Sequence, residues 1–490
     1  MIDLRDRRSS LTGVSLLLLL LLFLKYAWTA LVFDVPLGYD PGMYRYLFLR
    51  YSASFPFLPS LDPWGMEQPT GLFLLSALPL KFLSVDLMLG WIWNLVPVFL
   101  SGTFAWIFYR REGAVTGVCV LLMALISIAQ YDGFIAMYWK TFASLFFMIL
   151  TFTFLERKSW MAIPAGALTI AIHHQTGFLF LVTVGSWAAI RLWMDRKKPP
   201  LWLFVTVGVG ALLGILFYAP IWSTAVLPHF VSVFSGASMP AGSFPPPAFF
   251  FLHQGILLFF GLGGFVISFQ RERGTLWQWA VLWSGVFVVM HFFFYRRFFL
   301  HLDFFLVPFA ARGLVQLWKM HRSSFAHVLI ALALLAQAVA SAYSFAPEMF
   351  PFWCRMLPSV CSAFPPIVPE PEITVEALRE MSAARHRIPT ETLILSLEPT
   401  STPWLRGWMP DHRVAGPGIF SSPWDYDGWE RFLLGNESDR RELLRDLRGP
   451  VFLFVSPGFL KYYGAASENF LNDPCFQTTE FASFLSVSCL

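Results

Sequence analysis

Residues 11–31 read LTGVSLLLLLLLFLKYAWTAL, an apolar run that is long enough to cross a bilayer, since a span needs about 20 apolar residues. The next residues, VFDVPLGYDPG (32–42), place Asp34 and Asp40 directly where this span ends. Basic residues precede the run, as they do in a signal peptide, but Trp28 stands where signal cleavage requires a small side chain. We therefore expect a retained membrane anchor that carries two carboxylates to the membrane surface.

The composition of the whole chain has the same character. Of its 490 residues, 56% are hydrophobic and 18% aromatic, the charged fraction is 13%, and the mean hydropathy is +0.59. A soluble domain has a charged fraction of about 25%, so the composition predicts an α-helical, polytopic integral membrane protein. The net charge of +4 is too small, and the basic residues are too scattered, for a nucleic-acid-binding protein.

Charge clusters and Pro/Gly turns divide the chain into about eleven apolar segments of helical length. We expect transmembrane helices at 11–33, 86–109, 114–131, 140–155, 159–172, 175–193, 200–221, 249–269, 276–295, 298–318 and 325–345. Segment 71–84 is too short to span and carries Pro79 and Lys81, so we expect it to lie in the membrane interface on the outer side.

The basic residues between these segments predict the orientation. If the N-terminus is cytoplasmic, every turn on the cytoplasmic side is basic, as the positive-inside rule requires. These turns are YRREG (109–113), ERKS (156–159), DRKKPP (195–200), QRERG (270–274) and KMHRSS (319–324). An odd number of spans then places the C-terminal tail outside the cytoplasm. The predicted location is a multi-pass protein of a cytoplasmic or plasma membrane.

The tail differs from the rest of the chain in its hydrophobic pattern. Residues 390–399 and 449–458 have the pattern of short buried strands, and 427–447 has that of an amphipathic helix. This pattern predicts a small α/β domain.

We therefore expect two domains. Residues 1–345 would form a transmembrane catalytic domain, with interfacial helices in an outer loop at 34–85. Residues 346–490 would form the extracytoplasmic α/β domain.

Cysteine usage supports an extracytoplasmic tail, because disulfides persist in oxidising compartments. Four of the five cysteines lie in the tail, at Cys354, Cys361, Cys475 and Cys489. Of the three possible connectivities, pairing in sequence order is the simplest, so we expect Cys354–Cys361 and Cys475–Cys489. Cys119 lies in an apolar span, where a thiol behaves as a small hydrophobic group.

Ionisable residues gather in the turns that this orientation places outside, and such residues often mark functional sites in membrane proteins. They include Asp40, Glu67, Asp132, Lys140, His173, His174, Arg296 and Arg297. The Arg pair is the most informative, because paired basic residues otherwise lie on the cytoplasmic side. Guanidinium groups bind phosphate through parallel hydrogen bonds, so we expect this pair, with Lys140, to bind a lipid-linked phosphate. The alternatives are ordinary headgroups and a salt bridge with Asp303.

The other residues of this group also have alternative interpretations. Asp40 lies in GYDPG, a strong turn signal, although a turn residue can also be a catalyst. His173 and His174 adjoin a helix break, where imidazoles can cap carbonyl groups, bind a metal or contact a substrate. Asp132 and Glu67 are either substrate or metal ligands or solvated loop residues.

One carboxylate and one anion site are sufficient for group transfer at a membrane surface. The carboxylate acts as a general base that takes a proton from an acceptor hydroxyl. Fixed cations stabilise the charge that develops on the departing phosphate. We expect Asp40 to be this base.

The chain contains GYDPGMYRY (38–46), QPTGLFLLSALPLKF (68–82) and RRFFLHLDFFLVPFAARGL (296–314). Together these stretches resemble the GT-C class of integral-membrane glycosyltransferases. This class includes protein O-mannosyltransferases, aminoarabinose transferases and the catalytic subunit of oligosaccharyltransferase. Its donors are polyprenyl-phosphate or polyprenyl-diphosphate sugars. The resemblance implies a GT-C fold in which Asp40 is the catalytic acid of the first outer loop.

The same resemblance assigns further residues. Asp132 falls in the second outer loop, where oligosaccharyltransferase subunits place acidic metal ligands, so it implies Mg²⁺ or Mn²⁺ as a cofactor to consider. Arg296 and Arg297 occupy a position like that of a phosphate-contacting Arg. The stretch PWDYDGW (423–429) is similar to the acceptor motif Trp-Trp-Asp-Tyr-Gly, but it has one Trp before the Asp and an additional Asp427. Because Asp132 also has no acidic neighbour, a polyprenyl monosaccharide phosphate is the favoured donor.

The sequence thus predicts a glycosyltransferase that moves a sugar from a polyprenyl-phosphate-linked donor to a protein, lipid or glycan acceptor at the outer membrane face. The expected partners are membrane lipid, donor and acceptor. Two alternatives stay open: a transporter or lipid-linked-sugar flippase, since ionisable residues also mark transport paths, and a non-catalytic assembly subunit. The collection of charge at one face, without an evident inverted repeat, favours the enzyme.

Overall fold

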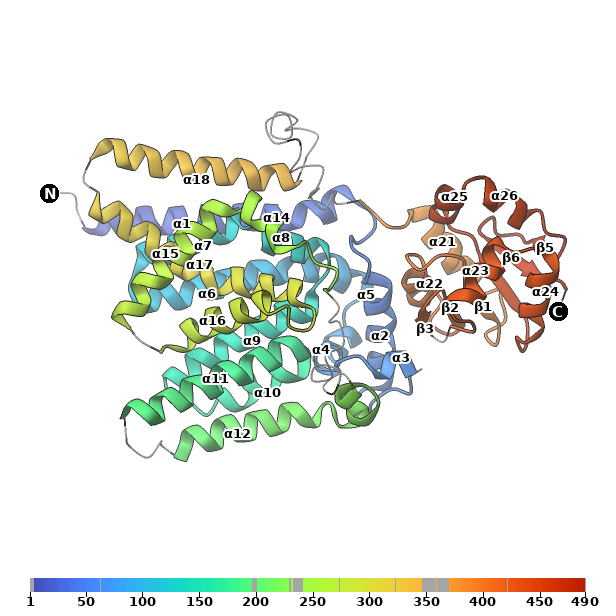
Figure 1. Ribbon diagram of the computed structural model, residues 1–490, viewed down its shortest axis with the longest axis horizontal. Helices are drawn as coiled ribbons and strands as arrows, with labels where there is room; N and C mark the ends of the chain where they lie inside the picture. The colour runs from blue at the N-terminus through green and yellow to red at the C-terminus, as the bar shows by residue number, and fades with distance from the viewer. Residues whose placement is uncertain are drawn as a thin grey trace. The chain divides into compact units, whose positions relative to one another are not determined.

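The computed structural model describes the chain except for residues 1–3, 62, 196–200, 229–230, 232–240, 273, 322, 346–357, 359–369, 421 and 490. The chain divides into two units (Figure 1). The first unit consists of Met1–Thr29, Pro69–Leu72 and Trp91–Pro369, and the second of Ala30–Gln68, Phe73–Gly90 and Glu370–Leu490.

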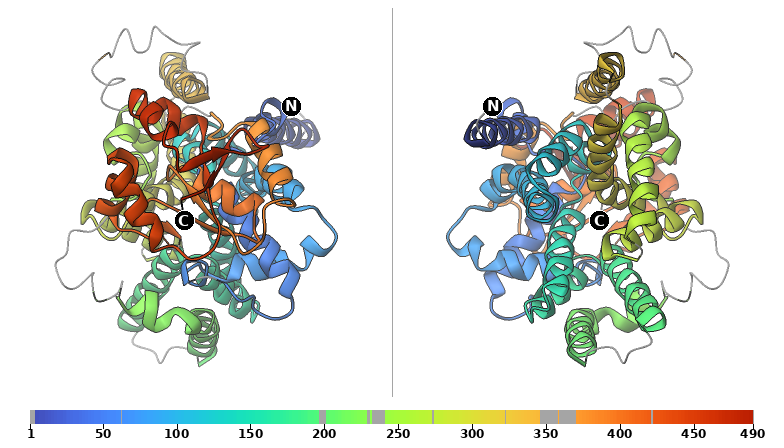
Figure 2. Two further views of the ribbon diagram at one scale, coloured as in Figure 1. Left: turned by 90° about the vertical axis from the view of Figure 1, so that its right-hand side faces the viewer. Right: turned by 90° about the vertical axis from the view of Figure 1, so that its left-hand side faces the viewer.

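The first unit is a bundle of apolar helices that run side by side, which Figure 2 shows end-on. Its main helices are α1 (Leu4–Val32), α6 (Trp93–Glu112), α7 (Ala114–Ile126), α8 (Ile128–Ile135), α9 (Trp139–Glu156), α10 (Ala162–Ile172), α11 (His174–Asp195), α12 (Leu201–Leu216), α14 (Pro247–His253), α15 (Gly255–Arg271), α16 (Leu276–Val289), α17 (Tyr295–Met320) and α18 (Ser324–Phe345). In the described part of the chain, six helices are long and apolar enough to cross a membrane, and the number rises to eight if each of two bent pairs is one span.

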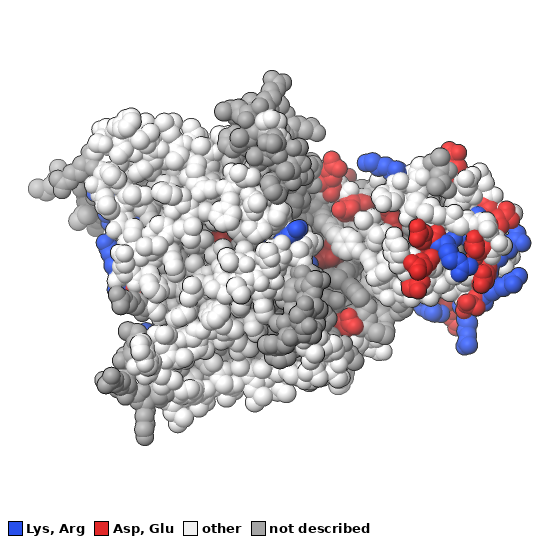
Figure 3. Space-filling view, in the orientation of Figure 1, with Lys and Arg blue, Asp and Glu red and all other residues white. Residues whose placement is uncertain are grey.

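Each range expected to span overlaps one of these helices, a bent pair or a shorter apolar helix, and the predicted helical membrane fold is confirmed. On the face shown in Figure 3, most described side chains of the helical unit are uncharged, and the few charged ones include basic groups at its left edge. Such a surface is suited to contact with lipid tails.

The prediction of continuous helices at 114–131 and 249–269 is wrong. α7 and α8 meet at an angle of 54°, and α14 and α15 meet at 96°. The first bend lies at Ser127, whose hydroxyl accepts a hydrogen bond from the Gln130 amide at 3.1 Å and so caps α8. The second lies at Gln254.

A buried carboxylate joins the two bends. Asp303 of α17 accepts hydrogen bonds from the Ser127 hydroxyl at 2.7 Å, from the Gln130 side chain at 3.2 Å and from the Gln254 side chain. The Gln254 carbonyl oxygen in turn accepts from the backbone amides of Ile128 and Ala129, at 2.7 and 3.0 Å. The amides released at the start of α8 therefore find a partner from α14–α15. This matters because an unpaired backbone group is costly in a membrane.

A lysine completes this network from the first helix. Lys25 is buried, and its ammonium group donates to the carbonyl oxygens of Leu125 and Ser127 at 2.7 and 2.8 Å. Leu125 lies in the last turn of α7, where carbonyls have no helical partner, and Ser127 lies at the bend itself. At the bend between α7 and α8, Lys25 therefore donates hydrogen bonds to backbone carbonyls, and Asp303 accepts hydrogen bonds from side chains.

Four of the five basic turns meet at one end of the bundle, here called the basic end. Arg111 binds Glu156 at 2.6 Å, and both Arg111 and Arg312 lie within 4 Å of Glu272, at 3.9 and 3.8 Å. Lys319 lines the same cavity as Glu272. The turns at 109–113, 156–159, 270–274 and 319–324 thus share one side of the bundle, as the predicted orientation requires.

The second unit contains a six-stranded sheet in the order β3-β2-β1-β4-β6-β5. The strands are β1 (Leu393–Ser396), β2 (Arg413–Gly416), β3 (Ile419–Phe420), β4 (Val451–Phe454), β5 (Phe476–Thr478) and β6 (Phe484–Val487). β1 pairs in parallel with β2 and β4, and the other pairings are antiparallel. Leu393 and Leu395 face one apolar core and Ile394 the other, so helices cover both faces of the central strand. The predicted α/β tail is confirmed.

The helices of this unit come from two parts of the chain. The outer loop contributes α2 (Pro41–Ser54), α3 (Pro63–Met66), part of α4 (Gly71–Ala77) and α5 (Val85–Leu87). The tail contributes α21 (Val375–Ala384), α22 (Thr402–Trp408), α23 (Tyr426–Leu434), α24 (Glu437–Arg445), α25 (Pro457–Tyr463) and α26 (Ala465–Leu471). The outer loop therefore packs with the sheet of the tail.

The single helix predicted at 427–447 is in fact two helices, α23 and α24. The chain is extended at Gly435, and Asn436 starts α24 with a capping box in which Asp439 is the reciprocal partner. The amide oxygen of Asn436 accepts from the backbone of Ser438 and Asp439 at 2.9 and 3.1 Å. Such local side-chain bonds compete with a continuous helix.

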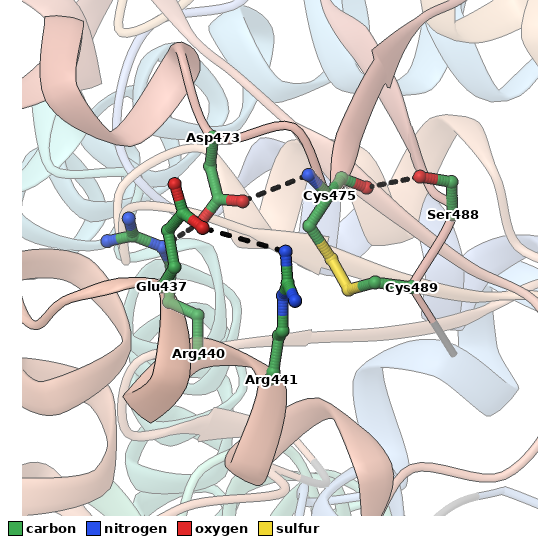
Figure 4. Close-up of a disulfide and its surroundings, with 7 residues drawn as sticks. All are labelled: Glu437, Arg440, Arg441, Asp473, Cys475, Ser488 and Cys489. Atoms are coloured by element: carbon green, nitrogen blue, oxygen red, sulfur yellow. Dashed lines mark hydrogen bonds and ion pairs between the residues drawn. A yellow bond between two sulfur atoms is a disulfide. The ribbon is translucent and has the colours of Figure 1, made fainter.

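A disulfide between Cys475 and Cys489 closes the edge of the sheet, as predicted (Figure 4). It joins the residues that flank β5 and β6, and the Ser488 amide also donates to the Cys475 carbonyl at 2.8 Å. Asp473, which pairs with Arg440, accepts from the Cys475 amide at 2.9 Å. Cys354 and Cys361 lie outside the described residues.

We predict that Asp303→Ala strongly lowers the thermal unfolding temperature of the detergent-solubilised protein. Three buried donors would lose their shared acceptor and Lys25 would lose a nearby negative charge, and such a loss costs about 3 kcal/mol or more. Ser284→Ala is the control, because the buried Ser284 hydroxyl only bonds to the Ala280 carbonyl of its own helix. Equal unfolding temperatures for the two variants would contradict the role of Asp303.

Candidate active site

Six side chains that can carry a positive charge gather near the N-terminal end of α17, and we call them the cationic cluster after its Lys and Arg members. They are Lys140, His173, His174, Arg296, Arg297 and His301. Lys140 lies in the first turn of α9, the histidine pair lies at the break between α10 and α11, and the others lie in the first turns of α17. His173 can reach this position because the backbone is extended there, at φ −149° and ψ 119°.

A chain of hydrogen bonds holds the histidines in place. The His173 Nδ1 atom lies 2.8 Å from the Thr176 hydroxyl, which also lies 2.8 Å from the His301 Nε2 atom. The His301 Nδ1 atom lies 3.2 Å from the Arg297 carbonyl oxygen. The rings of His173 and His301 are nearly parallel, with centroids 6.4 Å apart. Both are buried, whereas His174 is exposed.

Arg297 is held against aromatic and hydroxyl groups. Its guanidinium lies 5.0 Å from the ring centre of Tyr138 and 5.1 Å from that of Phe294, close enough for cation–π contacts. It donates to the Ser243 hydroxyl at 3.2 Å, and that hydroxyl lies 3.0 Å from the Tyr138 hydroxyl. In the loop that carries Ser243, the Ala241 carbonyl accepts a hydrogen bond from the Arg296 backbone amide.

The two guanidinium groups keep donor capacity for an anion. The Nε atoms of Arg296 and Arg297 are buried without a hydrogen-bond partner, and neither residue forms an ion pair with any residue that the structure describes. The N-terminus of the long helix α17 adds positive potential at the same place. A phosphate is the anion whose geometry suits paired guanidiniums.

The alternative of a salt bridge between the Arg pair and Asp303 finds no support in the geometry. Asp303 is fully buried, and its oxygens accept from Ser127, Gln130 and Gln254.

Asp40 belongs to the second unit, where it precedes α2. Its backbone has helical dihedrals, φ −88° and ψ −6°, and its side chain makes no capping hydrogen bond. Pro41 occupies the first helical position, as expected for a helix start. The GYDPG stretch, expected as a turn, bends directly into the start of α2, and the Asp40 carboxylate does not cap that helix.

The surroundings of Asp40 are acidic. Burial, followed by the charges of Asp40 and Glu372, raises the pKa of the Tyr39 phenol. Burial, followed by the charges of Glu398 and Glu370, also raises the pKa of Glu372. Such surroundings repel a phosphate and suit a group that accepts a proton from a neutral hydroxyl.

Contact with the sheet domain fixes α2, and hence Asp40. The Tyr39 hydroxyl donates to the Pro399 carbonyl at 3.2 Å, and Arg45 donates to the Gly407 carbonyl at 2.7 Å. α2 crosses α22 so closely that a Cβ atom added at Gly42 would lie 2.1 Å from the Pro403 carbonyl oxygen. A Cβ atom at Gly407 would likewise lie 2.4 Å from the Gly42 carbonyl oxygen.

The residues considered as substrate or metal ligands lie in different surroundings. Asp132 is fully buried in α8, and neither of its oxygens has a hydrogen-bond partner, so it is not a solvated loop residue. Glu67 is exposed and belongs to the second unit. Among the described residues, no group of three or more His, Cys, Asp or Glu side chains could hold a metal ion. The described residues therefore do not fit a Mg²⁺ or Mn²⁺ site.

The PWDYDGW stretch has a structural explanation in the sheet domain. The Asp425 carboxylate caps α23 by accepting from the Gly428 amide at 2.9 Å. Trp424 packs edge-on against Trp429, at a centroid distance of 4.9 Å. These residues hold the start of a helix.

Sequence reasoning missed three residues that shape the cationic cluster: Tyr138, Thr176 and Ser243. The Thr176 hydroxyl contacts the histidines, the Ser243 hydroxyl contacts Arg297, and the Tyr138 ring lies against the Arg297 guanidinium. Their only signal in the sequence is a polar side chain in or near an outer turn, which many other residues share.

We predict that Gly42→Ala destabilises the second unit, because the methyl group would overlap the backbone of α22. Overpacking typically costs about 1–3 kcal/mol, and at this separation the helices must move apart. The measurement is the thermal unfolding temperature of the full-length protein. Gly90→Ala is the matched control, since a Cβ atom there meets nothing within 4 Å. A Gly42→Ala protein as stable as Gly90→Ala would refute the close contact.

No family model matches the sequence. No curated protein matches it either. Solved structures do resemble the whole chain. Apo ArnT from Cupriavidus metallidurans, an aminoarabinose transferase, superposes with a TM-score of 0.53 at 12% identity, over 98% of this chain and 98% of that one. ArnT from the same organism bound to undecaprenyl phosphate superposes with a TM-score of 0.54 at 13% identity, over 100% of this chain and 99% of that one. The chain has the GT-C fold, as the sequence resemblance implies.

Proposed function

We propose that this chain is a membrane-embedded glycosyltransferase that moves a sugar from a polyprenyl-phosphate donor to an acceptor hydroxyl at the outer membrane face. The observation that carries the proposal is the cationic cluster, in which Arg296 and Arg297 retain buried donor atoms without a protein partner. The fold supports it, since an ArnT of the same fold binds undecaprenyl phosphate. The basic end would face the cytoplasm, as the positive-inside rule requires.

In this proposal the cationic cluster holds the donor phosphate. Arg296 and Arg297 would donate to its oxygens, and Lys140 would add a third charge. Tyr138 and Ser243 keep the Arg297 guanidinium in a fixed position before the donor arrives. Fixed cations stabilise the charge that grows on the phosphate as its bond to the sugar breaks.

Asp40 is the proposed general base. Its carboxylate takes the proton of the acceptor hydroxyl while the acceptor oxygen attacks the anomeric carbon of the sugar. The bond between that carbon and the phosphate oxygen breaks, and the polyprenyl phosphate leaves with the electron pair. The acidic surroundings of Asp40 support this role, because neighbouring carboxylates disfavour the binding of a phosphate at this position.

A transporter or flippase is the second candidate, and one observation favours it. Lys25, Asp132 and Asp303 are fully or almost fully buried in the helical unit, as ionisable residues of transport paths are. Lys25 and Asp303, however, use their hydrogen bonds to hold the two helix bends. Consumption of a polyprenyl-phosphate sugar by the purified protein distinguishes the enzyme from this candidate and from a non-catalytic subunit.

We predict that Asp40→Asn abolishes sugar transfer and leaves membrane insertion and donor binding intact. An amide has nearly the size of a carboxylate but cannot accept the proton, and loss of a general base costs about 10²–10⁴-fold in rate. The measurement is release of polyprenyl phosphate from a polyprenyl-phosphate sugar in detergent. Asp34→Asn is the control, because Asp34 is exposed in the same loop. Turnover of Asp40→Asn at the rate of this control would remove Asp40 from the mechanism.

We predict that Arg296→Gln with Arg297→Gln raises the KM for the donor by about 10–100-fold, since each hydrogen bond to a charged group contributes about 1.5–3 kcal/mol. The KM for the acceptor should change little. Donor titration at saturating acceptor measures the effect, with Arg110→Gln at the basic end as the control. A donor KM that stays at the control value would refute phosphate binding by the Arg pair.

A further inference from the structure

A cavity of about 480 Å³ lies at the basic end of the first unit. Its walls come from the end of α6, the start of α7 and the C-terminal halves of α15 and α17. It has no role in the proposed transfer reaction, which uses the other end of α17. Arg297 and Lys319 are separated by 22 positions along this helix, or about 33 Å at 1.5 Å per residue. This length matches the hydrocarbon thickness of a bilayer, about 30 Å.

Part of the charge in the cavity is already neutralised. Arg312 binds the Glu112 carboxylate with both its Nε and Nη2 atoms, and its Nη1 atom donates to the Ser268 hydroxyl at 2.5 Å. Glu272 is 53% exposed and lies 3.8 Å from Arg312. The acidic groups of the cavity therefore have a basic partner within the wall.

Two basic groups of the cavity have no such partner. Arg271 and Lys319 are exposed, and neither forms an ion pair or a side-chain hydrogen bond within the described part of the chain. Three basic residues line the cavity against two acidic ones, so an anion is favoured there.

Part of the remaining wall is apolar. Ile267, Val315 and Met320 line the cavity beside the basic groups, and Met320 is 63% exposed. A free phosphate makes no favourable contact with an apolar wall. A lipid does, because its charged headgroup is joined to apolar acyl chains. Basic pockets between transmembrane helices commonly bind anionic lipid headgroups.

We propose that this cavity binds the headgroup of an anionic glycerophospholipid from the leaflet that surrounds the basic end. Arg271 and Lys319 bind the phosphate, and the Arg312–Glu112 pair fixes the wall behind it. Ile267 and Val315, which lie about one helical turn closer to the middle of the bundle than Arg271 and Lys319, contact the upper acyl chains. The bound lipid joins α6, α7, α15 and α17 and stabilises the bundle at this end.

The test is the thermal unfolding of the full-length, delipidated protein in detergent with phosphatidylglycerol, phosphatidylcholine or inorganic phosphate added. We expect phosphatidylglycerol to raise the unfolding temperature by several degrees, and the other two additions to have little effect. The shift should disappear in Arg271→Gln with Lys319→Gln. It should persist in Arg110→Gln with Lys158→Gln, which removes the same charge from exposed residues that do not line the cavity.

Native mass spectrometry of the same proteins provides a second measurement. The cavity variant should retain at least fivefold less phosphatidylglycerol than the wild type and the control variant. Equal retention by the two variants would overturn the site. An equal shift with inorganic phosphate, or a shift with undecaprenyl phosphate and none with phosphatidylglycerol, would overturn the glycerophospholipid as its occupant.

Discussion

A helix that bends inside a membrane must find partners for the backbone groups that the bend releases, and in this protein one buried carboxylate organises those partners. Asp303 orients Gln254, and Gln254 accepts the free amides of Ile128 and Ala129. Lys25 satisfies carbonyls on the other side of the same bend. Without water to compete, each of these bonds is difficult to replace. Both bends depend on this network, and they set the directions of the helices on either side of them.

The same helix that carries Asp303 also links the two ends of the bundle. In the apolar 18-residue stretch of α17, 83% is buried inside the protein, a larger share than in any other long span of the described chain. Its first turns carry the Arg pair of the cationic cluster, and its last turns carry Arg312 and Lys319 of the basic end. Fixing α17 in the centre of the bundle therefore fixes both charged regions. The physical difference between them is pairing, because Arg111 and Arg312 of the basic end bind carboxylates, whereas neither Arg296 nor Arg297 forms an ion pair within the described part of the chain.

The proposed base is fixed by a different kind of contact. Asp40 precedes α2, which meets α22 through backbone atoms at Gly42 and Gly407. Two glycines allow a separation that no side chain would permit. The outer loop is thus part of the sheet domain, although more than 300 residues separate the two in sequence. A catalytic loop built onto a rigid domain is held in place more firmly than one that only connects two membrane spans.

Local patterns in the sequence determined much of this protein. Apolar runs determined where the helices lie, because each run satisfies its own backbone bonds within the membrane. The Arg pair was identified because it breaks the positive-inside pattern, and Cys475 with Cys489 because two cysteines lie near each other in the tail. Only the tertiary structure decided the bends, since the partner of Ile128 is Gln254, which is 126 positions away. It also decided which hydroxyls surround Arg297 and that α2 packs on α22. These contacts depend on the packing of distant segments, and no short window of sequence contains both partners.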